Sequence, residues 1–574
     1  MELSYVVIVC FLLSLAIFDL WVGVSNDAVN FLNSAIGAKV ARFRTVLVIA
    51  AVGVFFGAVT SNGMMDVARH GIIVPSNFSF EQVMMIFMAV MVTDVIILDI
   101  FNNLGLPTST TVSMVFELIG GTFALACIKV IGDSSLELTQ LLDAGSALKM
   151  IAAIFFSVLV AFALGTVVQW VSRLAFTFKY RERLKYFIGL FGGFSFTVML
   201  FFVFYQGLKT ASFVTDADRA WVNQHFLLLV ACAFVASALL SQLLHMLKVN
   251  VLRIIVLSGT FSLALAFAGN DLVNFIGVPL AGLSSFQDYF ANGSGNASTF
   301  MMTSLEESAS SPLLYLVIAA AVMITAMTMS KKAKNVIKTS VDLSAQDEGN
   351  EMFGTSRAAR SIVRTSQSVI DMFTRIVPHP VRRKVATRFN TADISLPKGA
   401  AFDEVRASIN LVMSAMLIIL GTTQKLPLST TYVTFMVAMG TSLADKAWGR
   451  ENAVFRITGV LSVVGGWLLT AAIASTACAI VVTCMYFGRF PVQCLFMVAV
   501  GLILWRSNKR YNKKQKARAE DDTFQLLIRT TDTDVAWELL KKHVMNTQVA
   551  TTRFAIEALT DITQGFAGHS SGRL

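Results

Sequence analysis

Long apolar stretches separated by short polar ones run along most of this chain. A stretch of about 20 apolar residues is long enough to cross the hydrocarbon core of a bilayer as a helix. Thirteen such stretches are predicted, at 5–25, 44–62, 82–101, 108–131, 147–170, 184–205, 221–246, 251–270, 313–330, 405–421, 430–444, 453–486 and 490–505. The pattern therefore predicts an all-α polytopic membrane protein.

Two polar motifs interrupt this apolar sequence, and each occurs twice. Asn26-Asp27-Ala28-Val29-Asn30 returns as Asn270-Asp271-Leu272-Val273-Asn274, and Leu106-Pro107-Thr108-Ser109-Thr110-Thr111 returns as Leu426-Pro427-Leu428-Ser429-Thr430-Thr431. Polar side chains are costly in hydrocarbon, so their repetition at corresponding places indicates one shared solute site between two halves of the chain. Transport is the expected function.

The two halves are expected to have inverted topology. Seven predicted crossings, an odd number, separate the two Asn-Asp motifs, so the second copy is turned over relative to the first. Pro107 and Pro427 interrupt apolar sequence, which predicts broken or re-entrant helices at the motifs.

The chain divides into five parts by hydropathy. The segment 331–400 holds 13 Lys/Arg against 6 Asp/Glu and has no stretch long enough to cross, so it is expected to be a cytoplasmic insert. Helical spacing is predicted within it at Ala358–Val377 and, in the tail, at Thr523–His543 and Thr551–Gln564. The expected parts are 1–205, the first transmembrane repeat with connecting helices; 206–330, the start of the second repeat; 331–400, the insert; 401–505, the remainder of the second repeat; and 506–574, a cytoplasmic C-terminal appendage.

The charge distribution predicts an orientation. Basic residues are concentrated in every second connection, whereas 63–81, 132–148, 206–220 and 281–312 carry few. The positive-inside rule explains the net charge of +10 without nucleic acid, and it places the N-terminus outside and the C-terminus in the cytoplasm of a multi-pass protein of the plasma (cell inner) membrane. Glycosylation sequons at Asn77, Asn292 and Asn296 fall in the expected outside connections.

Composition excludes the common enzyme classes. Hydrophobic residues make up 55% of the chain, charged residues only 14%, and the mean hydropathy is +0.67. The six cysteines and six histidines have neither zinc-site nor HExxH spacing, and neither a nucleophile with its base nor a phosphate-binding Gly-rich loop stands out. We expect no enzyme activity, no cofactor and no resident metal beyond a coupling ion.

The Pro-x-Ser-Thr-Thr motifs predict helix starts that bind an anion. Proline favours the first helical turn, and a hydroxyl near the cap lies beside unpaired backbone N–H groups. Two such ends facing one another would surround a small tetrahedral oxyanion with donors. The candidate anion-binding residues are Ser109, Thr110, Thr111, Ser429, Thr430 and Thr431.

The repeated aspartates require a cation, because a carboxylate repels an anion and is costly in hydrocarbon. Carboxylate and amide oxygens, with carbonyls exposed by a helix break, suit Na⁺, and a protonated aspartate would instead couple transport to H⁺. The candidate coupling-ion residues are Asn26, Asp27, Asn30, Asn270, Asp271 and Asn274.

Other polar residues also lie in apolar sequence, and the sequence does not indicate which of them have a functional role: Asp19, Asp94, Asp99, Asn102, Asn103, Glu117, Gln424 and Lys425. Asp19, Asp99 and Glu117 align with Leu263, Ile419 and Val437 of the other half, so they break the symmetry. Gly120 and Gly440 do align, which predicts close helix contacts at both places.

The paired motifs resemble the inorganic phosphate transporter (PiT) family, whose halves each carry an Asn-Asp signature and a Leu-Pro-x-Ser-Thr-Thr element. The resemblance covers both halves and extends to Ser34-Ala35-Ile36-Gly37-Ala38-Lys39, Gly57-Ala58-Val59 and Gly71-Ile72. It implies symport of inorganic phosphate with Na⁺ or H⁺ at the repeat interface. Carried over, Asp27, Asn30, Asp271 and Asn274 would hold coupling ions, and the six Ser and Thr residues would face phosphate.

Two alternatives remain open at this point. Hydroxyl and amide donors alone do not fix the charge of the anion, so a symporter for another tetrahedral oxyanion such as sulfate fits the same residues. A membrane phosphate sensor or a channel would keep the fold without concentrative turnover. The oligomeric state is not readable from the sequence.

Overall fold

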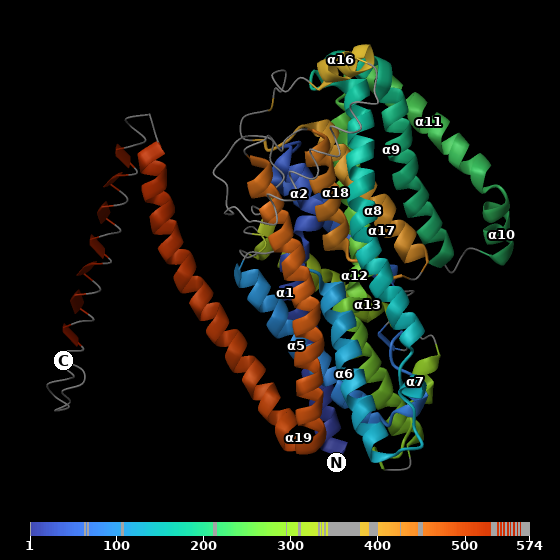
Figure 1. Ribbon diagram of the computed structural model, residues 1–574, viewed down its shortest axis with the longest axis vertical. Coiled ribbons are helices and arrows are strands. Elements are labelled where there is room, and N and C mark those ends of the chain that lie inside the picture. The colour runs from blue at the N-terminus through green and yellow to red at the C-terminus, as the bar shows by residue number, and fades with distance from the viewer. Residues whose placement is uncertain are drawn as a thin grey trace. The chain divides into compact units, whose positions relative to one another are not determined.

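The computed structural model describes most of the apolar part of the chain. The described residues are 2–61, 65, 68–69, 71–104, 108–210, 215–293, 296–307, 311–330, scattered positions from 333 to 341, 379–389, 396, 400–424, 426–445, 452–529 and scattered positions from 537 to 563. Over these ranges the secondary structure is helical, with two isolated bridges and no strand. The predicted all-α class is confirmed (Figure 1).

Each of the thirteen predicted apolar stretches overlaps a helix, but α12 continues well past the stretch 251–270 to Asn292, and the stretches 453–486 and 490–505 both lie in α19, which continues to Arg529. Within the described residues, nine helices are long and apolar enough to cross a membrane, and α3 and α13 are shorter apolar helices. The helices used below are α1 (Glu2–Asp27), α2 (Val29–Gly37), α3 (Phe43–Val59), α5 (Phe80–Leu104), α6 (Thr110–Gly132), α8 (Ala144–Phe176), α9 (Tyr180–Thr210), α11 (Phe226–Met246), α12 (Val251–Asn292), α13 (Leu313–Met329), α16 (His379–Arg388), α17 (Glu404–Thr423), α18 (Thr430–Ala444) and α19 (Asn452–Arg529).

The chain forms two compact units, Met1–Val498 and Ala499–Leu574. The boundary lies within α19, in which Arg489 has a non-helical backbone (φ 48°) that separates two helical segments. The helix predicted at Ala358–Val377 lies outside the described residues, as do parts of those predicted at Thr523–His543 and Thr551–Gln564.

Two helical hairpins enter the first unit from opposite ends. At the outer end of the first hairpin, the ammonium group of Lys129 on α6 donates to the carbonyl of Asn77, which lies just before α5 (2.6 Å). The outer ends of α17 and α18 are joined at the other end of α8, where Arg173 pairs with both Asp403 and Asp445 (2.7 Å each). The lower position of α5 and α6 relative to α18 can be followed in Figure 1. The apolar stretches 82–101 and 108–131 therefore form one helical hairpin, and the stretches 405–421 and 430–444 form the second.

The helices that carry the Asn-Asp motifs differ from the prediction in one respect. Only a one-residue turn at Ala28 separates α1 from α2, and α12 continues without interruption through Asn270–Asn274. The prediction of a helix break at the second motif is wrong. Because α12 is continuous there, it exposes no backbone carbonyls at Asn270–Asn274. A break is unnecessary because neighbouring side chains supply the hydrogen bonds that the polar groups of the motif need.

The two aligned glycines allow close contact between the halves, as predicted. A Cβ atom on Gly440 of α18 would lie 2.4 Å from the carbonyl oxygen of Phe162 in α8. A Cβ atom on Gly120 of α6 would lie 2.1 Å from the carbonyl oxygen of Ser475 in α19. Each hairpin thus packs, backbone against backbone, on the long helix that follows the other hairpin in sequence.

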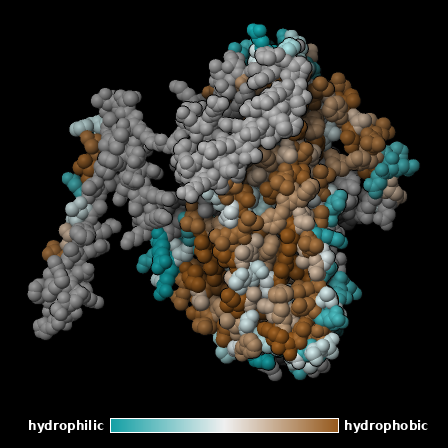
Figure 2. Space-filling view, viewed as in Figure 1, coloured by the Kyte–Doolittle hydropathy of each residue, from teal (hydrophilic) through white to brown (hydrophobic). Residues whose placement is uncertain are grey.

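The outer face of the first unit is apolar, as a lipid-facing surface must be. Large apolar side chains are exposed along α8, α9 and α11, including Phe156, Leu190, Leu227 and Leu239. In Figure 2, hydrophobic residues cover much of the coloured surface of this face, and hydrophilic residues gather at its lower end and right edge. Among the described helices that are long and apolar enough to cross a membrane, α5, α17 and α12 are the most buried, and the motif residues of both hairpin tips are buried with them.

Breaking the buried pairing of Arg173 is expected to destabilise the protein strongly. In Arg173→Met, Asp403 and Asp445 would lose their cation while remaining almost fully buried, which costs about 3–5 kcal/mol. The measurement is the thermal unfolding midpoint in detergent, with Arg253→Met as control because Arg253 is exposed. Equal midpoints for the two variants would contradict the structural role given to Arg173.

A methyl group on Gly440 is expected to force α18 away from α8. The atom it would meet belongs to the backbone and cannot turn aside, so Gly440→Ala should cost about 1–3 kcal/mol of stability. Gly465→Ala is the control, because a Cβ atom there meets nothing within 4 Å. That change should leave the unfolding midpoint unchanged or raise it through the better helix propensity of alanine. A loss of stability in both variants would argue against the close contact.

Candidate functional site

The N-terminal ends of α6 and α18 meet in the middle of the first unit. Ser109 caps α6 by accepting the backbone N–H of Val112 (3.1 Å), and Ser429 caps α18 by accepting that of Tyr432 (3.1 Å). The N–H groups of the first two residues of each helix, which precede the capped residue, have no acceptor within the helix, so they are available at its end. The predicted helix starts are confirmed, and each serine hydroxyl still has its own proton to donate.

Asp27 receives one hydroxyl from each hairpin. Thr110 of the first hairpin donates to Oδ2 (2.9 Å), and Thr431 of the second donates to Oδ1 (3.0 Å). The carboxylate is fully buried. Both oxygens are therefore held by threonines that lie more than 300 residues apart in sequence.

Asp271 has the same arrangement with the halves exchanged. Thr430 of the second hairpin donates to Oδ2, and Thr111 of the first donates to Oδ1 (3.1 Å). Asp271 also accepts from the side-chain amides of Asn270 (2.7 Å) and Asn274 (3.2 Å). Each aspartate is thus bonded by its own half and by the opposite half.

Two asparagines bridge the same threonines. The Asn30 amide donates to Thr431 (2.9 Å) and Thr430 (3.3 Å), which belong to the opposite half. The Asn274 amide donates to Thr111 (3.0 Å) and Thr110 (3.3 Å), again across the halves. Each threonine oxygen therefore accepts one amide proton, which leaves it a second lone pair, while the threonine protons are directed at the aspartates.

Asn26 and Asn270 hold the turns that precede the two helix starts. Asn26 accepts the backbone N–H of Thr108 (2.9 Å) and donates to Asn102 (2.8 Å). Asn270 donates to the carbonyl of Leu428 (2.8 Å) and accepts from Thr422 (3.4 Å). These contacts fix where each hairpin tip lies relative to the motif helices.

All twelve candidate residues lie together, and none is more than 6% exposed. The side-chain oxygen of Asn274 is buried with no donor among the described residues. A buried carbonyl oxygen beside a carboxylate and hydroxyl oxygens is a donor set that suits a hard monovalent cation. The described residues contain no group of three His, Cys, Asp or Glu side chains that could hold a metal ion, so such a cation would depend on Thr and Asn oxygens.

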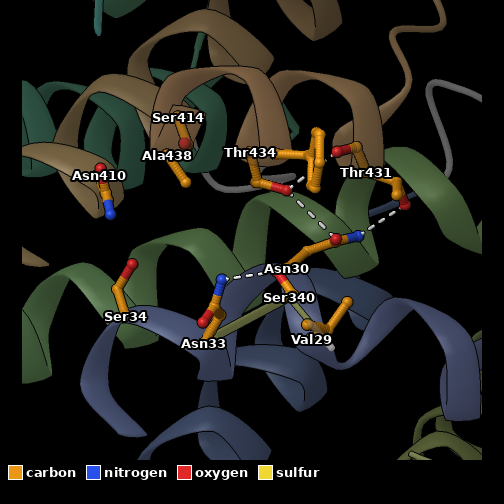
Figure 3. Close-up of a pocket in the computed structure, with 11 residues that line it drawn as sticks. Val29, Asn30, Asn33, Ser34, Ser340, Asn410, Ser414, Thr431, Thr434 and Ala438 are labelled. Atoms are coloured by element: carbon orange, nitrogen blue, oxygen red, sulfur yellow. Dashed lines mark hydrogen bonds between the residues drawn. The ribbon is translucent and has the colours of Figure 1, made fainter. Parts of the chain in front are cut away.

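A small polar cavity lies against this cluster, between α2 and the second hairpin. Figure 3 shows Asn30 reaching across it to Thr431 and Thr434, with Asn33 bonded to Ser340 (2.8 Å) at its edge. The cavity leaves about 10 Å³ for the centre of a water-sized sphere, which is room for a single water. A tetrahedral oxyanion would need the surrounding helices to separate.

Three residues of the site escaped the sequence analysis. Thr422 and Thr434 bond to the motif asparagines, and Asn33 lines the cavity. Thr422 follows Asn102 by the same number of residues that separates the two Leu-Pro motifs, so the two residues occupy corresponding positions in the two halves. That offset could have identified Thr422, whereas nothing in the sequence marks Thr434 or Asn33.

Comparison with known proteins agrees with this geometry. A model of the phosphate transporter family matches residues 23–341, which include both Asn-Asp motifs and the first Leu-Pro motif. A solved structure of a sodium-dependent phosphate transporter is similar in fold, with a TM-score of 0.58 at 15% identity over 84% of this chain and 99% of that one. No curated protein sequence matches the chain.

These findings point to a transporter and not to an enzyme, as expected. The family model spans more than half of the 574 residues, and the fold is a multi-pass membrane fold. The resemblance noted in the paired motifs is therefore confirmed, and the chain belongs to the phosphate transporter family.

Proposed function

We propose that this protein is a secondary active transporter that imports inorganic phosphate with Na⁺ by alternating access. Na⁺ occupies sites at Asp27 and Asp271, and phosphate binds between the N-terminal ends of α6 and α18. The observation that carries the proposal is the set of four threonine hydroxyls shared between the two aspartates. The name of the structurally similar protein, a sodium-dependent phosphate transporter, favours Na⁺ over H⁺ as the coupling ion.

The cations must bind before the anion. With both aspartates charged, the site repels phosphate, and the threonine protons are already directed at carboxylate oxygens. A sodium ion beside Asp27 neutralises that charge and takes the threonine oxygen as a ligand. The hydroxyl proton is then free to turn toward a phosphate oxygen, so one threonine serves both the cation and the anion.

Phosphate recognition then uses the helix ends. The caps at Ser109 and Ser429 leave two backbone N–H groups at each helix start, and the positive end of each helix dipole faces the same space. Donors from opposite directions suit a tetrahedral anion. The six predicted residues Ser109, Thr110, Thr111, Ser429, Thr430 and Thr431 are the proposed phosphate contacts.

Alternating access follows from hairpins that enter from opposite ends. We propose that the segments 1–205 and 206–330 with 401–505 are inverted repeats, and that separation of one hairpin from the opposing half opens the site to one side at a time. Loss of the threonine contacts on that side would let phosphate enter or leave. The contacts at Gly120 and Gly440, made of small residues and backbone, allow such sliding.

The same proposal includes the cellular setting. The N-terminus lies outside and the C-terminus in the cytoplasm of the plasma (cell inner) membrane, with 331–400 and 506–574 as cytoplasmic additions. The distribution of basic residues along the sequence supports this orientation.

Removing either carboxylate is expected to abolish coupled uptake. In proteoliposomes with an inward Na⁺ gradient, Asp27→Asn and Asp271→Asn should reduce uptake of labelled phosphate roughly tenfold or more, because one charged contact is worth on the order of 1.5–3 kcal/mol. Asp288→Asn is the control, since Asp288 lies near the far end of α12. Uptake that needs no ion gradient, or that both variants retain, would refute the coupling scheme. If a proton gradient drives uptake in place of the Na⁺ gradient, the coupling ion is H⁺. If sulfate competes as strongly as arsenate, the assignment of phosphate as the substrate is wrong.

The shared role of the threonines can be tested by binding. Thr431→Val should weaken Na⁺-dependent phosphate binding, measured by calorimetry, roughly tenfold to hundredfold because one hydrogen bond to a charged group is lost. Thr431→Ser should preserve it. Thr260→Val is the control, because the Thr260 hydroxyl bonds only within its own helix, to the carbonyl of Val256 (2.9 Å). Phosphate binding by the wild type without Na⁺, at undiminished affinity, would overturn the proposed order.

A further inference from the structure

Three carboxyl groups outside the central site are buried together. Asp19 on α1, Asp94 on α5 and Glu117 on α6 are each at most 1% exposed, and α5 packs on both α1 and α6. Asp19 and Asp94 lie within hydrogen-bonding reach of one another. Such a contact between two carboxyl groups is attractive only when a proton lies between them.

Hydrogen-bond donors for these groups are scarce. The hydroxyl of Ser113 donates to Oε1 of Glu117 (2.9 Å), so it cannot also donate to Asp94. Both oxygens of Asp19, both of Asp94 and Oε2 of Glu117 are buried without a donor among the described residues. Ionised carboxylates in such a place would carry a desolvation penalty that nothing nearby offsets.

No basic group compensates this charge within the described part of the chain. The buried cation Arg173 pairs with Asp403 and Asp445, and the exposed Arg489 pairs with Glu81. The titratable groups that face the three acids are Asp27 of the central site and Cys478 of α19, with Asp271 beyond Asp27. None of these groups supplies a positive charge.

A metal ion is a poorer match than a proton. A metal needs several oxygens converging on one point, and the described residues contain no group of three acidic, His or Cys side chains in such an arrangement. A proton needs only the pairwise contact that Asp19 and Asp94 make.

The second half of the chain does not repeat these acids. The corresponding positions hold Leu263, Ser414 and Val437, and Ser414 lines the polar cavity beside Thr431. One flank of the central site therefore has room for a water, whereas the other has three buried carboxyl groups, of which Asp19 and Asp94 face Asp27.

We propose that Asp19, Asp94 and Glu117 form a proton-binding site in which each of the three carboxyl groups carries a proton, with the proton of one aspartate directed at the other aspartate. Full protonation keeps the flank neutral. Loss of one of these protons places negative charge near Asp27, which favours cations there and disfavours phosphate. The site thus makes the central binding equilibria depend on pH, and its existence does not depend on the proposed transport function.

The test detects protonated carboxyl groups directly. Infrared spectra of the purified full-length protein, without phosphate, are compared at neutral pH for the wild type, Asp94→Asn, Asp19→Asn and Glu117→Gln. We expect a carbonyl band of protonated carboxyl groups that shifts on deuteration and loses intensity in Asp94→Asn, Asp19→Asn and Glu117→Gln. Asp99→Asn is the matched control, because Asp99 lies on the same helix and accepts a hydrogen bond from Asn103 (3.1 Å). It should leave the band unchanged.

Three outcomes would overturn the proposal. They are the absence of the band in the wild type, a band unchanged in both aspartate variants, and a wild-type band that Na⁺ alone abolishes, which would indicate a sodium site. The two aspartates are replaced separately so that one variant that fails to fold, judged by its elution profile and circular dichroism, leaves the other to decide. Because phosphate uptake is not measured, a failure here is distinct from a failure of the transport proposal.

Discussion

The whole arrangement depends on the need of two buried carboxylates for partners. Asp27 and Asp271 lie in the dry interior, where an unpaired charge is unstable. Their partners are hydroxyls at the tips of two hairpins, and each hairpin serves both aspartates. The hairpins must therefore reach the middle of the protein from opposite ends, and the helix starts must be capped by their own serines so that the threonines are free to face the aspartates.

The packing of the long helices follows from the same requirement. A hairpin that ends in the interior needs a support along its length, and the glycines at 120 and 440 let each one lie directly on a helix of the other half. The two halves of the chain therefore contact one another along these long helices as well as at the site. This explains why residues far apart in sequence share so many contacts around one small volume.

The sequence predicted most of this site because its signals are local. Apolar length marks the helices, proline followed by hydroxyl residues marks their starts, and the repeated motifs indicated that both copies belong to one place. The pairing of Thr110 and Thr431 with the same aspartate was beyond such signals, because it depends on the packing of distant helices. The break expected at Asn270 is absent because the polar groups there bond to the side chain of Asp271 and to the carbonyl of Leu428 in the second hairpin, so no carbonyl of α12 itself has to be exposed. The meeting of Asp19 with Asp94 was hidden for the same tertiary reason.

The bases of the two hairpins are fastened with unequal strength. Arg173 joins the second hairpin through two buried ionic contacts, whereas Lys129 joins the first to a neutral carbonyl nearer the surface. Spreading the legs of the second hairpin would leave two buried acids without their cation, whereas spreading those of the first would cost the two part-buried hydrogen bonds of Lys129, to the Asn77 carbonyl and the Gln82 side chain. In the proposed alternating-access motion, the two legs of the second hairpin would therefore move together as a rigid piece, with internal bending confined to the first hairpin.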